Sequence, residues 1–286
     1  MQGPKQSTFR PTVMAAPPAA QPALLRYPEV KPFGEGYVDV GVPTEGGPIP
    51  DDFVLRELLE IDVSSDLAVT GLVVRYGALT SVGEDPFRYL PASELWRGPF
   101  PGVLADRRAF AGAGDVHPGF VESVEAMRLH LRAARAMGRH LLAHLEGDPG
   151  GVLAAWPLEG FSKPRSTGMA WDWWQDFMNA ALAPFRMFIQ VAHPDEYTRT
   201  GASAMPAPTL HNACALQLAQ ILAGESQVKR CANERCARPF TRQRTTAARR
   251  RNPDQFHLSG VLYCSRECLK AKNERERRQR RKANGS

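Results

Sequence analysis

Apolar residues recur at steps of three and four between positions 120 and 145, and this is the strongest periodicity in the chain. The apolar stripe is formed by Phe120, Val124, Met127, Leu131, Ala134, Gly138, Leu141 and Leu145. The arginines of the same segment lie off the stripe, at positions Arg128, Arg132, Arg135 and Arg139. This spacing predicts a long amphipathic helix with one face in a hydrophobic core.

Two histidines on this predicted helix, His140 and His144, lie one turn apart. A histidine pair at this spacing can bind zinc. The sequence reads His-Leu-Leu-Ala-His, however, and it lacks the glutamate that a metalloprotease helix carries beside its first histidine. We therefore favour a partly buried helical face over a metal site for this pair.

Two short helices are predicted before this segment. The first covers residues 53–60 and can be capped by Asp51 or Asp52. The second starts from capping residues at 64–66 and stops at Gly77, a residue that favours helix ends. Two such helices in succession predict a helical hairpin.

Two further helices are predicted after the long one. An apolar helical region opens at residues 172–178, can be kinked by Pro184 and ends near His193. A last helix covers residues 209–223, and its buried positions are Leu210, Cys214, Leu218 and Ile221. These helices together predict a mainly α fold.

The remaining segments of the first 228 residues predict little regular structure. Residues 1–30 are rich in Pro, Ala and Gln, which predicts a disordered leader. Residues 37–42 alternate weakly and support one short strand or an extended arm, whereas the Gly and Pro residues between 80 and 118 predict loop. We therefore divide the chain into this leader, a mostly helical body of unknown function over residues 31–228, and a small module over residues 229–286.

Four cysteines of the last module form two closely spaced pairs. Cys231 and Cys236 are separated by four residues, and Cys264 and Cys268 by three. Zinc prefers four thiolate or imidazole ligands in a tetrahedron, and two short-spaced pairs can supply all of the corners. We predict one structural zinc ion bound by these four cysteines, with no open position for catalysis.

Two alternatives compete with a zinc site, namely two disulfides or four unrelated buried thiols. Disulfides require an oxidising compartment. The N-terminus argues against export, because Pro17, Pro18 and Pro22 interrupt its apolar residues. We therefore expect a cytoplasmic protein with reduced thiols. His257 lies between the two pairs and could replace one thiol, although a complete set of four cysteines favours a bystander role for it.

The residues around the cysteines predict how the module folds. The first pair would lie on a loop knuckle, and residues 237–263 are long enough for a β-hairpin. Ser265 can cap a helix that brings Cys264 and Cys268 to one face. Knuckle, hairpin and ligand-bearing helix are the plan of a treble-clef zinc finger. The predicted fold is a helical N-terminal body followed by a small treble-clef-like zinc finger with a basic helix.

Charge is distributed unevenly along the chain. Residues 229–282 contain 18 Lys and Arg against 5 Asp and Glu, a net charge of +13. The whole chain carries +6, so the rest of it carries −7. An acidic body joined to a strongly basic end predicts that this end meets a polyanion.

The basic residues of the module fall in three places. Arg242 and Arg244 would share one side of a strand with Phe240, a basic run would occupy the hairpin loop, and the final helix would continue to Lys282. Guanidinium groups bind phosphates and guanine edges, and counterion release supplies affinity. The candidate nucleic-acid-binding residues are Arg242, Arg244, Arg249, Arg250, Arg251, Lys270, Arg275, Arg277, Arg278 and Arg281.

Over about residues 229–282 the chain resembles the C-terminal zinc finger of bacterial ABATE/CGNR-type proteins. The matching residues are the cysteines at positions 231, 236, 264 and 268, with Phe240 after the first pair. The Cys-Gly-Asn-Arg signature of the family would begin at Cys268, where this chain reads Cys-Leu-Lys-Ala. The resemblance implies a stress-induced transcription regulator in which a variable helical domain precedes the finger and its basic tail.

These observations predict a zinc-dependent nucleic-acid-binding protein, most directly a DNA-binding transcription regulator, with DNA favoured over RNA as the expected partner. The alternative is a zinc-finger module that binds RNA or an acidic protein surface without DNA specificity. The helical body would sense an effector or form homo-oligomers.

Neither an enzyme nor a membrane protein is predicted. The chain has no Gly-rich phosphate loop ending in Gly-Lys-Ser/Thr and no Gly-x-Ser-x-Gly motif. Its most apolar region, residues 180–192, is too short to cross a bilayer and is interrupted by Pro184 and Arg186.

Overall fold

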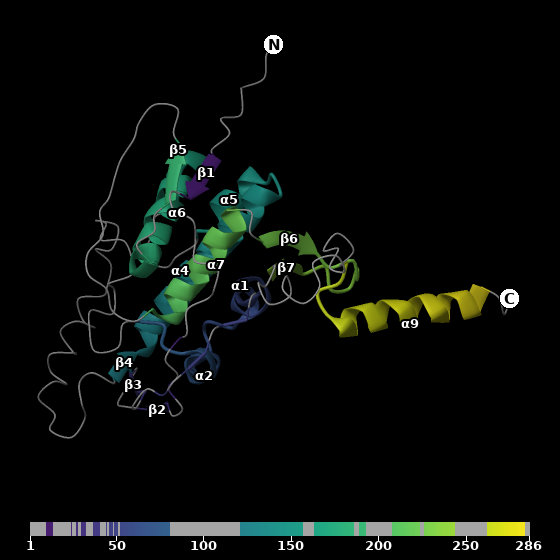
Figure 1. The fold of residues 1–286 in the computed structure, drawn as a ribbon, viewed down its shortest axis with the longest axis horizontal. Helices are drawn as coiled ribbons and strands as arrows, with labels where there is room; N and C mark the ends of the chain where they lie inside the picture. Colours follow the sequence, from purple (N-terminus) through teal and green to yellow (C-terminus); the bar gives the residue numbers. More distant parts are fainter. Residues whose placement is uncertain are drawn as a thin grey trace, which may run out of the picture.

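The computed structural model describes residues 10–13, 24, 27, 30–32, 37–40, 44, 46–47, 49–50, 52–80, 121–156, 163–185, 189–192, 208–223, 226–243 and 262–283. This part of the chain is mainly helical, as predicted, with small two- and three-stranded sheets beside the helices. Figure 1 shows the C-terminal helix extending away from the other elements.

Helix α4, Val124–Leu145, lies at the centre of the core and confirms the predicted amphipathic helix. The Trp174 indole donates a hydrogen bond to the Met137 carbonyl oxygen at 3.0 Å and so ties α6 to α4. The α-helices that contact α4 are α1 (Phe53–Arg56), α2 (Asp66–Tyr76), α5 (Pro149–Ala154), α6 (Thr167–Leu182) and α7 (Leu210–Leu222).

The start of α4 differs from the sequence prediction. The Ser123 hydroxyl accepts a hydrogen bond from the Ala126 amide at 3.3 Å and caps the helix, which therefore begins at Val124 and not at position 120. The preceding residues form strand β4, Val121–Ser123. Strand β3, Tyr37–Asp39, pairs antiparallel with β4 and with β2, Lys31–Pro32, which confirms the predicted short strand.

The predicted helix over residues 53–60 is divided in two. Helix α1 covers Phe53–Arg56, and a 3-10 turn covers Leu58–Glu60. The Arg135 guanidinium of α4 donates hydrogen bonds to the carbonyl oxygens of Leu59 and Ile61, at 3.2 and 2.9 Å, and so ties the end of this turn to α4. The next helix, α2, is confirmed, because Ser65 caps its start and Gly77 lies at its end with a φ of 112°.

The predicted apolar helix near residue 172 is confirmed as α6, but its C-terminal boundary is corrected. Helix α6 ends at Leu182, and a 3-10 turn over Ala183–Phe185 follows. Proline has no amide hydrogen and breaks a helix interior, so Pro184 ends the helix. Beyond it, Ile189–Ala192 forms strand β5 instead of continuing the helix, and His193 lies outside the described residues.

The disordered leader expected over residues 1–30 is corrected at several positions. Strand β1, Arg10–Val13, pairs antiparallel with β5. Leu24 and Tyr27 are buried in the hydrophobic core. The strand partner of β1 lies far away along the chain, so the local composition of the N-terminus could not reveal it.

Helix α7 is confirmed and leads directly into the C-terminal module. Thr209 and Asn212 form a capping box at its start, and Cys214 is buried within it, as predicted. Strand β6, Ser226–Arg230, follows and pairs antiparallel with β7, Pro239–Gln243.

Two further predictions concern a membrane-spanning helix and the loop between residues 80 and 118. Among the described residues, no helix combines the length and the apolarity needed to cross a bilayer. The loop predicted over residues 80–118 lies outside the described residues from position 81 onward.

Candidate metal centre and basic helix

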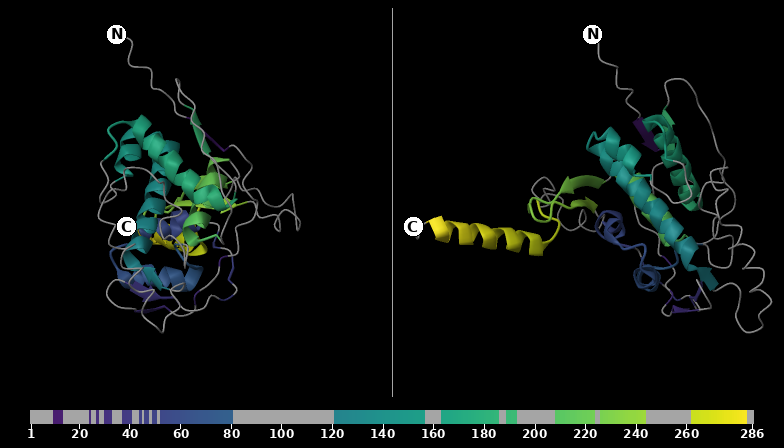
Figure 2. Two further views of the ribbon diagram at one scale, coloured as in Figure 1. Left: turned by 90° about the vertical axis from the view of Figure 1, so that its left-hand side faces the viewer. Right: turned by 180° about the vertical axis from the view of Figure 1, so that it is seen from behind.

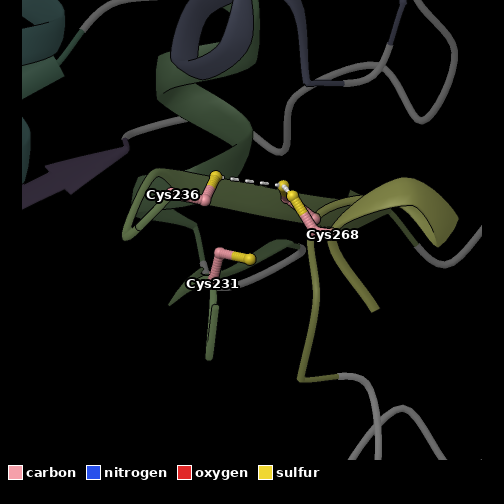
Figure 3. A group of neighbouring side chains, drawn as sticks. Cys231, Cys236 and Cys268 are labelled. Carbon is pink, nitrogen blue, oxygen red and sulfur yellow. Dashed lines mark hydrogen bonds between the residues drawn. The ribbon is translucent and has the colours of Figure 1, made fainter. Parts of the chain in front are cut away.

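The structure brings together the four cysteines that the sequence pattern singled out. The thiol sulfurs of Cys231, Cys236, Cys264 and Cys268 all lie within 4.8 Å of one another. The Sγ atoms of Cys236 and Cys264 are 3.6 Å apart, and those of Cys264 and Cys268 are 3.4 Å apart. Figure 3 shows the labelled thiols pointing toward a common centre.

The first cysteine pair lies on a knuckle at the turn between β6 and β7. The Cys231 amide donates to the Arg238 carbonyl oxygen at 2.9 Å, which closes the turn at its base. Within the knuckle the amides of Cys236 and Ala237 donate to the Asn233 carbonyl oxygen at 2.8 and 2.9 Å. Ala237 has a φ of 46°, a left-handed conformation that turns the chain sharply after the second thiol.

The second pair lies at the start of helix α9, Arg266–Ala283. The Cys268 amide donates to the Ser265 hydroxyl at 3.3 Å, which confirms Ser265 as the predicted cap. The Ala232 amide donates to the Leu262 carbonyl oxygen at 2.7 Å and holds this segment against the knuckle. Two short backbone segments, far apart in sequence, thus present two thiols each to one point.

The spacing of the thiols fits a tetrahedral metal site. A metal–sulfur distance of about 2.3 Å places tetrahedral sulfurs about 3.8 Å apart, close to the separations in the cluster. A disulfide would bring two sulfurs to about 2.05 Å. All four cysteines are free thiols here, so the disulfide alternative has no support, and the cluster could hold a metal ion.

The thiols differ in acidity. Burial, together with hydrogen bonding to neighbouring thiols, raises the pKa of Cys264, and burial also raises the pKa of Cys236. Burial acts in the same direction on Cys268, but hydrogen bonds with Cys264, Cys236 and Ser265 outweigh it and lower the pKa of Cys268 to about 7. The thiolate is the form of cysteine that binds metal.

Asn233 connects the knuckle to α9, and the sequence analysis missed it. Its side chain is 5% exposed. The amide nitrogen Nδ2 donates to the Cys268 carbonyl oxygen at 3.4 Å, and the oxygen Oδ1 accepts a hydrogen bond from Arg275 two turns along the helix. Asparagine commonly occupies tight turns, which was the available signal, but its contact with α9 depends on tertiary structure.

The predicted nucleic-acid-binding residues of α9 are placed on one exposed helix. Lys270, Arg277, Arg278 and Arg281 are exposed, and Arg278 forms an ion pair with Glu274 at 3.1 Å. Arg275 is half-buried against Asn233, so the structure gives it a role in holding the helix.

The remaining candidates are only partly described. Arg242 lies in β7 opposite Gln227, which confirms its place in a strand. The described hairpin, β6 and β7, encloses the first cysteine pair, whereas most of the hairpin expected over residues 237–263 lies outside the described residues. Four of the predicted arginines also lie outside them, together with His257: Arg244, Arg249, Arg250 and Arg251.

The C-terminal module is attached to the helical body by ion pairs as well as by the chain. The Arg230 Nε atom donates to the Glu146 carboxylate at 3.0 Å, just beyond the end of α4. Arg238 lies 3.8 Å from Glu60. Strand β7 also contacts α1, and its Phe240 is buried. The module is therefore held against the body and does not hang from a free tether.

The histidine pair on α4 has a packing role. The His140 ring is fully buried and lies against the rings of Trp156, Trp171 and Trp174. Its Nδ1 atom accepts a hydrogen bond from the Trp156 indole at 2.9 Å. Burial, and then the charge of His144, lower the pKa of His140 to about 3. The face that holds the pair is therefore apolar, as the sequence pattern favoured.

The chain was also compared with known proteins. It matches no protein-family model, no curated protein and no solved structure at a significant level.

Proposed function

We propose that this chain is a zinc-dependent nucleic-acid-binding protein, most directly a DNA-binding transcription regulator with a treble-clef-like finger. One observation carries the proposal: the cluster of four thiols lies at the base of α9, an exposed helix in which basic residues outnumber acidic ones. The resemblance to ABATE/CGNR-type fingers rests on the same cysteines and supports the same function.

Zinc is the metal that suits this ligand set best. Four cysteine thiolates in a tetrahedron are a common structural zinc site and leave no open coordination position for a substrate. The metal would fix the start of α9 against the knuckle, so that the basic side chains are presented from a rigid base. The role proposed for the metal is therefore structural.

Nucleic acid is the partner that suits the charge. Residues 229–282 carry a net +13, whereas the rest of the chain carries −7. Such a distribution directs a polyanion to the finger and repels it from the body.

The first test measures metal content and DNA binding on the full chain. Mass spectrometry of the purified protein should find one zinc per chain, and Cys231→Ser should abolish it. Cys214→Ser is the matched control, because Cys214 is buried in α7 outside the cluster, and it should keep the metal. Retention of full metal content by the Cys231 variant would contradict the site.

The second test follows binding to random-sequence duplex DNA as a function of salt. Affinity should fall steeply with rising salt for the unmodified protein and be largely lost for Cys231→Ser. Competition with duplex RNA shows whether the protein binds DNA or RNA more tightly. Tight DNA binding that is insensitive to both salt and the cysteine change would contradict the proposal.

A further inference from the structure

Helix α9 stands apart from the hydrophobic core. The right-hand view of Figure 2 shows it extending from the C-terminal module, away from the helices of the body. It has 18 residues, and none of its described side chains is buried. At about 1.5 Å per residue it is about 27 Å long. A helix this exposed has room to meet a large partner.

One side of α9 is occupied by the finger itself. Cys268 belongs to the thiol cluster, Arg275 donates to Asn233, and the Lys272 ammonium lies 5.8 Å from the centre of the Tyr263 ring. At about 100° per residue these positions fall within about 60° of one another around the helix. Lys272 and Arg275 are half-buried, in agreement with this placement.

The opposite side of α9 is basic and exposed. We call it the α9 basic face. Its residues span about 100° around the helix axis and include no acidic side chain. All of them are exposed: Arg266, Lys270, Asn273, Arg277, Arg280 and Arg281.

Carboxylates border the α9 basic face on both edges. At about 100° per residue, Glu267 and Glu274 lie along one edge and Glu276 along the other. Glu274 pairs with Arg278 at 3.1 Å and Glu276 with Lys272 at 3.8 Å, so the basic residues off the face are partly neutralised. A helix inserted in a major groove meets phosphates on both walls, where these glutamates would lie. The narrow α9 basic face therefore fits a single row of phosphates better than it fits the two walls of a major groove.

We propose that the α9 basic face lies along the phosphate backbone of duplex DNA and contributes affinity without reading sequence. This inference rests on the nucleic-acid-binding function proposed above. A duplex presents closely and regularly spaced phosphate charges along its length, to which a row of basic side chains is complementary. Phosphate contacts fix the position of a protein on the duplex but carry no base information. Any sequence preference must then come from elsewhere in the module.

The test compares two variants of the full, zinc-loaded chain. Arg277→Gln/Arg281→Gln removes two charges from the α9 basic face. Lys272→Gln/Lys282→Gln removes two charges from α9 at positions off the face, neither of them a candidate nucleic-acid-binding residue. Glutamine is nearly as good a helix former as arginine or lysine, and circular dichroism checks that the helix is kept. Binding to two unrelated DNA duplexes is followed by fluorescence anisotropy over a range of salt concentrations.

The expected result is a loss confined to the first variant. The slope of log affinity against log salt should decrease by about 1.8 for Arg277→Gln/Arg281→Gln, which is about 0.9 for each phosphate contact, and should change little for the control. The loss should be equal on both duplexes. Equal losses of affinity for the two variants, or a loss on only one duplex, would contradict the proposed role of the α9 basic face without contradicting DNA binding by the protein. If the unmodified chain binds no duplex, the proposed function itself fails.

Discussion

Asn233 shows how one residue can connect a metal site to the helix that follows it. Its backbone oxygen organises the knuckle, and its side chain reaches both the Cys268 carbonyl oxygen and Arg275. Polar groups next to metal ligands orient them and tune the affinity of the site. If the cluster holds a metal ion, Asn233 should therefore support its binding without being a ligand.

Asn233→Ala should weaken metal binding by about tenfold to a hundredfold, the range found for partners of metal ligands elsewhere. Competition with a chromophoric chelator measures this. The control is Asn273→Ala, the same truncation at an exposed position on the far side of α9, which should leave metal affinity unchanged. Equal affinities for the two variants would show that the Asn233 contacts do not support the site.

His140 should make the stability of the body depend on pH. Its pKa in the folded protein is about 3, below its ordinary value of 6.5, because the ring is buried. Above pH 6.5 the His140 ring is neutral in both the folded and the unfolded protein, so its titration does not reduce the free energy of unfolding. As the pH falls below 6.5, only the unfolded chain takes up the proton, so stability decreases by about 1.4 kcal/mol per pH unit.

His140→Gln should flatten this dependence, because glutamine does not titrate and can still accept the Trp156 hydrogen bond. Urea unfolding at a series of pH values between 6.5 and about 5, followed by tryptophan fluorescence, measures the difference. Metal loss at low pH affects both proteins alike, so the comparison isolates the histidine. Parallel curves for the two proteins would show that His140 is not the titrating group.

At the scale of elements, the cap of α9 links helix stability to metal binding. The Ser265 hydroxyl accepts from the Cys268 amide in the turn that carries two thiols. Ser265→Ala should lower the stability of the first turn of α9 by about 1 kcal/mol and weaken metal affinity by about fivefold. Ser265→Asp keeps a capping oxygen and should therefore retain most of the metal affinity of the unmodified protein. Chelator competition on both variants checks this, and equal losses would argue against the cap.

The helices were predictable from sequence where local chemistry decides their limits. Ser65, Thr209 and Ser265 cap helices near the expected positions, and Gly77 ends α2 as expected. Where tertiary contacts decide, the predictions failed. The helical periodicity begins at position 120, but residues 121–123 pair with β3, which is distant in sequence, and so form strand β4 instead of the first turn of the helix.

The candidate site shows the same division. The cysteine spacing identified all four thiols, because short-range geometry limits where paired ligands can lie. The role of Asn233, the half-buried position of Arg275 and the attachment of Arg230 to Glu146 depend on residues distant in sequence. Sequence spacing carries no information about such contacts.

At the scale of the whole molecule, two buried residues of the C-terminal module lie outside the main hydrophobic cluster, although β7 contacts α1. Cys231 and Phe240 are buried, yet neither belongs to the hydrophobic cluster formed by the helices of the body. The ion pairs of Arg230 and Arg238 with the body are largely exposed and contribute at most about 1 kcal/mol each. Metal removal should therefore affect the two parts unequally.

Chelation should increase hydrogen exchange in α9 and the knuckle while leaving α4, α6 and α7 protected. Tryptophan fluorescence should change little, because all the described tryptophans lie in the body core. Exchange measured by mass spectrometry with and without chelator provides the data, and Cys231→Ser without chelator serves as the control. Loss of protection in α4 after chelation would show that the metal supports the entire fold.

The position of the thiol cluster at the first turn of α9 also has a thermodynamic consequence. Nucleation is the unfavourable step of helix formation, and α9 has no apolar face to stabilise it afterwards. A metal ion that fixes the first turn would order the helix before any partner arrives, so the entropy of ordering would not reduce the affinity for DNA. Because linkage is reciprocal, bound DNA should strengthen metal retention by the same factor by which the metal strengthens DNA binding.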